Sequence, residues 1–147
     1  FGILSRNDKV GSKIIRARTW SRWSHVAMLL DDEVVLESVA AHGVRLRALK
    51  ALKQDSTDWV IFAIPCPQAN LVRNFAKGQL GKPYDILWAL GLGINRDWQD
   101  DDKWGCSEIF AWPFQQAGYP IFRAEEVHAI TPQDIWRIPF EVVSRKV

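Results

Sequence analysis

Cys106 is the residue of this chain whose type and position most clearly suit covalent chemistry. It is one of two cysteines in 147 residues, and it follows Gly105 at the start of a predicted helix in the segment WGCSEIF (104–110). A cysteine is a nucleophile only as the thiolate, and the positive end of a helix dipole favours that form. Taken alone, Cys106 is equally consistent with a small buried thiol that fills a gap in the core.

The other cysteine and two of the three histidines have simpler interpretations. Cys66 stands between prolines in IPCPQ and is expected to be a small apolar residue in a bend. His128 falls in a loop before a capped helix, and His42 precedes a glycine and is expected in a turn. His25 differs, because it opens the apolar segment HVAMLL. A histidine there is either a core residue with its hydrogen bonds satisfied or a base held by a specific partner.

Glu37 is the candidate partner of His25. The sequence HVAMLL-DDE-VVLES predicts a hairpin over 25–38. A three-residue loop that pairs Leu29 with Glu33 would bring His25 directly opposite Glu37, with both side chains on one face.

A different register would separate this pair. A slip of one residue would place Ser38 opposite His25 and turn Glu37 to the other face. Burying both an imidazole and a carboxylate is costly unless they pair, which favours the first register. In that register Cys106, His25 and Glu37 suit the roles of nucleophile, base and orienting residue.

The elements that must position these residues alternate between strands and helices. Strands are expected at 1–5, 25–30, 34–38, 43–46, 59–64 and 135–143, and helices at 12–19, 68–80, 84–92, 107–118 and 131–136. This order predicts one α+β domain over 1–147, with a small antiparallel sheet packed with helices.

Four residues carry finer expectations about the helices. Ile14 and Ile15 are expected to face inward from the first helix. Pro113 predicts a kink or an early end in the helix that follows Cys106, and Gly118 is expected just after that helix ends.

Charge and composition exclude some classes and leave others open. The net charge is +2, with a basic N-terminal segment (6–22) and an acidic run (97–102). The basic segment suits nucleic acid, an anionic membrane, an anionic cell-wall polymer or simply a solvated face. The eight tryptophans suggest aromatic walls around a cleft.

Several kinds of site are not expected. No apolar stretch reaches the roughly 20 residues of a membrane span, and two cysteines do not make a disulfide framework. No zinc spacing, calcium loop, phosphate loop or nucleic-acid motif is present, so no cofactor, metal or nucleic-acid partner is expected. Because the sequence starts at Phe1 and not at Met, the lack of a signal peptide does not fix the compartment. The oligomeric state is also left open.

Five segments in order carry a resemblance to a known family. They are SHVAMLL, VLESVAAHGVRL, LGKPYDILWAL, WGCSEIFAWPFQQAG and ITPQDIW, and the match extends from the N-terminal strand to about Trp136. The set resembles the YiiX/YebB-like cysteine hydrolases, in the circularly permuted branch of the NlpC-type, papain-like cell-wall peptidase superfamily. That branch includes relatives of lecithin:retinol acyltransferase. The chain order, with His25 before Cys106, agrees with the permutation.

The resemblance implies a function and four site residues. Cys106 would be the nucleophile, His25 the general base and Glu37 the orienting residue, while Tyr84 would line the site and assist the oxyanion. The expected substrate is a peptide or acyl amide, such as a bacterial cell-wall peptide. A soluble protein of bacterial or phage origin that acts at the cell envelope is expected. Relatives that act on lipid acyl groups leave a lipid acyl hydrolase or acyltransferase open. A non-catalytic binding domain is the alternative from another class.

Overall fold

The computed structural model describes residues 1–84, 103–123 and 130–146, and within them one antiparallel sheet organises the chain. The strand order is β4-β3-β2-β1-β5-β6. The strands are β1 (Gly2–Arg6), β2 (His25–Leu29), β3 (Val34–Val39), β4 (Gly43–Ala48), β5 (Asp58–Ala63) and β6 (Glu141–Arg145). The helices are α1 (Val10–Thr19), α2 (Leu49–Asp55), α3 (Ala69–Lys77), α5 (Cys106–Gln116) and α6 (Pro132–Arg137). The predicted α+β class and antiparallel sheet are confirmed.

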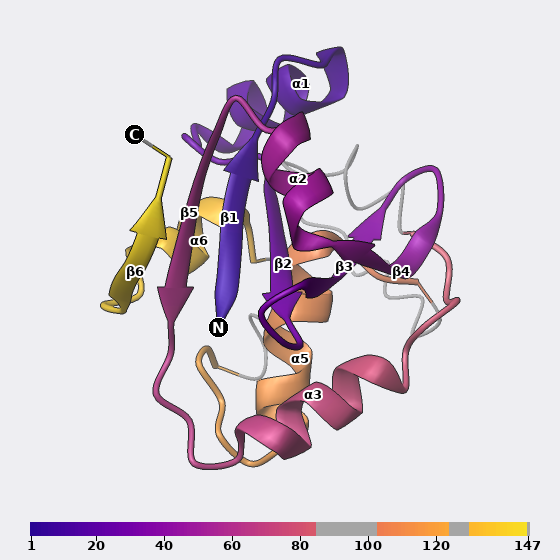
Figure 1. The fold of residues 1–147 in the computed structure, drawn as a ribbon, viewed down its shortest axis with the longest axis vertical. Coiled ribbons are helices and arrows are strands. Elements are labelled where there is room, and N and C mark those ends of the chain that lie inside the picture. Colours follow the sequence, from indigo (N-terminus) through magenta and orange to yellow (C-terminus); the bar gives the residue numbers. More distant parts are fainter. Residues whose placement is uncertain (85–102, 124–129, 147) are drawn as a thin grey trace.

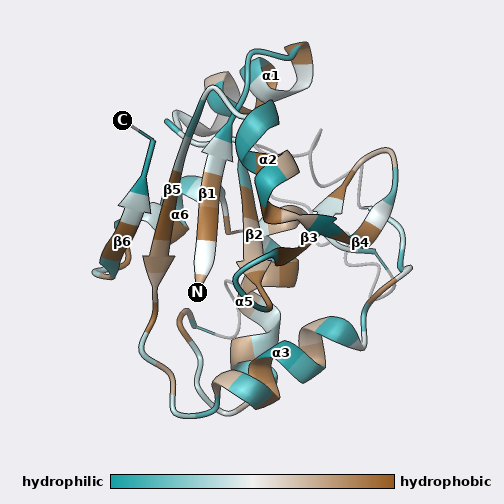
Figure 2. Ribbon diagram, in the orientation of Figure 1, coloured by the Kyte–Doolittle hydropathy of each residue, from teal (hydrophilic) through white to brown (hydrophobic). Residues whose placement is uncertain are grey.

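Helices cover both faces of the sheet because the strands present apolar side chains in both directions. On one face Val26 and Met28 of β2 pack with residues of α3, α5 and α6. On the other face Ala27 and Leu29 pack with Leu49 and Leu52 of α2. Figure 1 shows α5 behind β2 and α2 in front of it, and Figure 2 shows hydrophobic residues along the central strands. The central strands therefore hold the two layers together.

The β2–β3 hairpin forms, but its register differs from the expected one by two residues. Leu29 pairs with Val35, not with Glu33. The loop consists of Asp31–Glu33. The Asp31 carboxylate stabilises this loop by accepting hydrogen bonds of 2.8 Å from the backbone N–H groups of Glu33 and Val34. A shift of two residues preserves the face of every side chain, so His25 and Glu37 stay on one face as diagonal neighbours.

Helix α5 has well-defined ends that fix where Cys106 lies. The Glu108 carboxylate accepts a 2.7 Å hydrogen bond from the Gly105 N–H, which caps the first turn. The helix runs through Pro113 to Gln116. It then ends in a Schellman motif, with Gly118 at φ 73°. The predicted helix start and the predicted glycine after the helix are both confirmed.

Some expected elements are wrong or shifted. The sequence LKALKQD forms α2, which was not predicted. Within the strand expected at 135–143, residues 135–137 belong to helix α6 and residues 141–143 to strand β6. Ile14 is 48% exposed and does not face inward. The expected helix at 84–92 lies outside the described residues except for Tyr84, as do the acidic run and His128. In the described part of the chain, no helix is long and apolar enough to span a membrane.

Gly43, the first residue of β4, packs closely against the backbone of Lys82. Its φ is +66°, and a Cβ at this position would lie 2.2 Å from the Lys82 carbonyl oxygen. That carbonyl accepts a 2.8 Å hydrogen bond from the Val44 N–H. The close approach of the two backbones therefore requires glycine.

A pair of glycine-to-alanine variants tests this constraint. Gly43→Ala is expected to lower the free energy of unfolding by roughly 2 kcal/mol or more, because it combines positive φ with a clash. Gly11→Ala lies within α1, where a Cβ meets no atom within 4 Å, and it should raise that free energy by about 0.5–1 kcal/mol. Urea unfolding of both variants measures the difference. Equal effects would contradict the close approach at Gly43.

Candidate active site

Cys106 is the first residue of α5 and is 3% exposed. Its N–H belongs to the first helical turn, where backbone donors lack an acceptor within the helix. Trp104, two residues before Cys106, is held by two hydrogen bonds of its backbone. The Ser38 hydroxyl donates a 2.6 Å hydrogen bond to the Trp104 carbonyl, and the Trp104 N–H donates to the Pro83 carbonyl at 3.0 Å. These bonds place the start of the helix against β3.

The start of α5 reaches the space between β2 and β3 because these two strands diverge. Next to their turn they pair at Met28–Leu36 and Leu29–Val35. Continuing that register would pair Val26 with Ser38, but the Val26 N–H donates to the Cys106 sulfur instead. The diverging strands therefore bring Cys106 into contact with the backbone of β2, beside His25.

His25 connects Cys106 to Glu37. Its Nε2 lies 2.9 Å from Oε2 of Glu37. An imidazole has two ring nitrogens, so the hydrogen bond between His25 and the Cys106 side chain falls to Nδ1. The His25 side chain is 18% exposed, so solvent reaches it. The three residues thus form one hydrogen-bonded line from sulfur through imidazole to carboxylate.

Glu37 is held by arginines as well as by His25. Its side chain is fully buried, and it stands opposite Arg45 in the β3–β4 ladder. Oε1 lies 2.9 Å from Nε and 2.8 Å from Nη2 of Arg45, and 3.8 Å from Nη1 of Arg47. A buried carboxylate with such partners stays charged and fixed in orientation.

The pKa values of Cys106 and His25 are both shifted in the direction that favours an ion pair between them. Burial opposes the charged form of His25, but hydrogen bonds and charge from Cys106 and Glu37 outweigh it and raise the pKa of His25 to about 9. Burial opposes the Cys106 thiolate, yet the hydrogen bond and charge of His25 lower the pKa of the thiol overall. The arrangement therefore favours a thiolate beside an imidazolium.

The carboxylate of Glu37 shows the same balance. Burial alone would raise its pKa, but the hydrogen bond and charge of His25, together with Arg45 and Arg47, lower the pKa to about 2. Glu37 thus stays ionised at neutral and mildly acidic pH.

Three other residues of interest in the sequence are Tyr84, Cys66 and His42. The backbone of Tyr84 forms a bridge with Trp104, two residues before Cys106, and its side chain is half-buried. Cys66 is half-buried near Gln68. His42 lies exposed in the turn before β4. Neither of these two belongs to the line of Cys106, His25 and Glu37.

Sequence reasoning missed the arginines that hold Glu37. Arg45 and Arg47 alternate along β4, in the segment GVRLRA, and so share a face with each other. Extending the hairpin to this third strand would have placed Arg45 opposite Glu37. The bond from the Val26 N–H to sulfur has no signal in the sequence, because any residue has an N–H.

Comparison with known proteins establishes the fold. No family model matches the chain, and no curated protein matches it. Among solved structures, metalloprotein YiiX from Escherichia coli O157:H7 is similar, with a TM-score of 0.74 at 21% sequence identity. The similarity covers 99% of this chain and 95% of that one. In the described ranges of this chain, no group of three or more His, Cys, Asp or Glu side chains is arranged to hold a metal ion.

The pKa shifts predict the pH dependence of alkylation at Cys106. Iodoacetamide is expected to modify Cys106 well below its usual pKa of 9.0, because the sulfur is already a thiolate there. His25→Ala should move this reactivity to higher pH. Peptide mass spectrometry measures the rate at Cys106, with Cys66 of the same molecule as the internal comparison. Identical pH profiles in the wild type and the variant would contradict the ion pair.

Glu37 predicts a loss of stability in acid. Its folded pKa of about 2 lies below the usual 4.5, so its stabilisation is present above pH 4.5 and disappears as pH falls toward 2. The shift corresponds to about 3 kcal/mol. Glu37→Gln should therefore be less stable than the wild type at pH 6, with the difference shrinking between pH 4.5 and 2. Chemical unfolding at several pH values measures this, and a constant difference would count against a charged Glu37.

Proposed function

We propose that this protein is a cysteine hydrolase that cleaves an amide bond through Cys106, His25 and Glu37. The observation that carries the proposal is the line of hydrogen bonds from the Cys106 sulfur through His25 to Glu37, with its lowered thiol pKa and raised imidazole pKa. A nucleophile beside a base that a third group orients is the arrangement such chemistry needs.

The reaction follows from where the proton lies. In the free enzyme the proton rests on His25, and the Cys106 thiolate attacks the carbonyl carbon of the amide. The Cys106 N–H, at the start of α5, stabilises the oxyanion that forms, and we assign a supporting role to Tyr84. His25 then gives its proton to the departing amine, which leaves a thioester on Cys106. Water then gives a proton to the neutral His25 and attacks the thioester, which releases the acid and restores the thiolate–imidazolium pair.

Glu37 acts in this proposal by position and charge. Its bond to Nε2 keeps Nδ1 of His25 directed at the sulfur and stabilises the imidazolium. Arg45 holds the other carboxylate oxygen, which stops Glu37 from rotating away.

The proposal includes a finer description of the fold and a class of substrate. The structural likeness to YiiX over nearly the whole chain supports a circularly permuted papain-like fold, in which the histidine strand precedes the cysteine helix. With the resemblance of the sequence motifs, it favours a bacterial cell-wall peptide as substrate and action at the cell envelope.

One observation favours a second substrate class. Trp104 is buried next to Cys106, and its ring lies 5.0 Å from that of Trp112. An aromatic wall beside the nucleophile suits an acyl chain as well as an apolar peptide. A lipid acyl hydrolase or acyltransferase with the same three residues is therefore the second candidate.

Turnover assays on both substrate classes test the proposal. Cell-wall peptides with amide cross-links, and amides and esters of long acyl chains, are incubated with the protein, and the products are identified by mass spectrometry. Cys106→Ala should abolish turnover, and His25→Ala should lower it by roughly 10²–10⁴-fold. Glu37→Gln should lose less than either, because Glu37 orients and does not react. Cys66→Ala is the matched control and should keep full activity.

The pH profile gives a second readout. The rate should rise as Cys106 ionises and fall near pH 9, where His25 loses the proton that the leaving amine requires. A Cys106→Ala variant as active as the wild type would overturn the proposal. Failure of every substrate while Cys106 remains reactive would favour the binding-domain alternative.

A further inference from the structure

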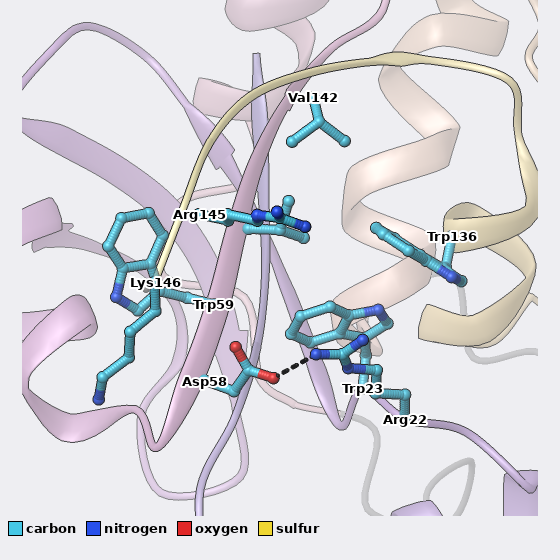
Figure 3. Close-up of a pocket in the computed structure, with 9 residues that line it drawn as sticks. Arg22, Trp23, Asp58, Trp59, Trp136, Val142, Arg145 and Lys146 are labelled. Carbon is cyan, nitrogen blue, oxygen red and sulfur yellow. Dashed lines mark hydrogen bonds and ion pairs between the residues drawn. The ribbon is translucent and has the colours of Figure 1, made fainter.

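A cavity lies away from the candidate active site, between β5, β6, α6 and the residues that lead into β2 (Figure 3). Its volume is about 310 Å³. It is lined by Arg22, Trp23, Asp58, Trp59, Val60, Trp136, Val142, Arg145 and Lys146. None of these is Cys106, His25 or Glu37, so the cavity is separate from the chemistry proposed above.

Two tryptophans form an apolar wall of the cavity. Trp23 is 1% exposed, and its ring lies 5.5 Å from that of Trp136 at an angle of 58°. The indole Nε1 of Trp23 is buried without a hydrogen-bond partner among the described residues. A buried donor without an acceptor is costly and is usually satisfied by water or a ligand.

Basic side chains outnumber acidic ones around this wall. Asp58 is the one acidic residue in the lining, and it is already neutralised by Arg22 at 2.8 Å and Arg6 at 3.5 Å. The Arg22 guanidinium also lies 5.1 Å from the centre of the Trp23 ring. The field at the cavity is therefore positive.

Arg145, unlike Arg22, is not paired with Asp58. In Figure 3 its side chain extends toward the side where Trp23 and Trp136 lie. No carboxylate of the described residues forms an ion pair with it. Lys146, by contrast, lies across β5 with Trp59, and its Nζ donates a 2.9 Å hydrogen bond to the Ser56 carbonyl. Arg145 is thus the group that is placed to receive an anion.

We propose that this cavity binds a small molecule that carries a carboxylate or phosphate on a flat apolar group. The Arg145 guanidinium pairs with the anion, for which its two parallel N–H donors suit either a carboxylate or a phosphate. The apolar group packs on Trp136, whose ring lies 5.5 Å from that of the buried Trp23. Arg22, held between Asp58 and the Trp23 ring, closes one side of the cavity.

Binding of four probes to the whole chain tests each part of the proposal. Naphthoate and naphthyl phosphate share the flat ring and distinguish the two anions. Naphthamide has the ring without the charge, and acetate has the charge without the ring. Ligand-observed NMR titrations give each dissociation constant. At least one of the two ring-bearing anions should bind, and both naphthamide and acetate should bind at least about tenfold more weakly.

Three variants assign the binding to this cavity. Arg145→Gln should weaken the ring-bearing anion by about tenfold or more, because the paired charge is lost. Arg137→Gln is the matched control: it removes an exposed arginine of α6 that does not line the cavity, and the affinity should stay unchanged. Asp58→Asn removes the acidic residue of the lining and should tighten binding, a gain that partial unfolding would not produce.

The outcomes are distinct. Weakening by Arg145→Gln together with tightening by Asp58→Asn supports the proposal. Equal binding by the wild type and Arg145→Gln, equal binding of naphthoate and naphthamide, or no binding of either anion at millimolar concentration overturns it. Because Cys66 and Cys106 are unchanged in these variants, iodoacetamide reactivity at Cys106 should stay at the wild-type rate. The proposal of ligand binding in the cavity and the proposal of hydrolase activity are therefore tested independently.

Discussion

The buried carboxylate of Glu37 is the constraint on which the candidate site depends. A charge with no exposed surface must find compensating charge and hydrogen bonds inside the protein, because leaving it unpaired is strongly destabilising. Arg45 satisfies one oxygen and His25 the other. This fixes the rotation of the imidazole, which leaves its second nitrogen for Cys106. The burial of Glu37 thereby links three strands, β2, β3 and β4, to the Cys106 sulfur.

A second physical feature is the separation of β2 from β3. Two strands of a regular sheet would exchange hydrogen bonds along their whole length and leave no room for a helix terminus between them. Here the ladder stops near the turn, and the Val26 N–H and Ser38 hydroxyl bind Cys106 and Trp104 instead. The start of α5 is therefore bonded to both strands at the place where they no longer pair with each other.

The sheet carries two distinct places with different chemistry. Where β2 and β3 separate, the charges are paired within the protein: the Cys106 thiolate with the His25 imidazolium, and the Glu37 carboxylate with His25 and Arg45. At β5 and β6, positive charge exceeds negative charge beside an aromatic wall. The first arrangement suits proton and acyl transfer within the protein. The second suits an anion that comes from outside it.

The sequence by itself determined the features that depend on neighbouring residues. The α+β class, the two strands around the DDE turn, and the helix that starts at Cys106 all follow from local residue patterns. The short amphipathic helix α2 was missed because its sequence LKALKQD carries no capping residue. The tertiary structure alone decided the hairpin register, the clamp of Arg45 on Glu37, and the contact of the Val26 N–H with Cys106. Either hairpin register closes through a three-residue loop, and the Asp31 hydrogen bonds select one of them. The other two features arise between segments far apart in the chain, and such contacts form only when the whole sheet and α5 pack together.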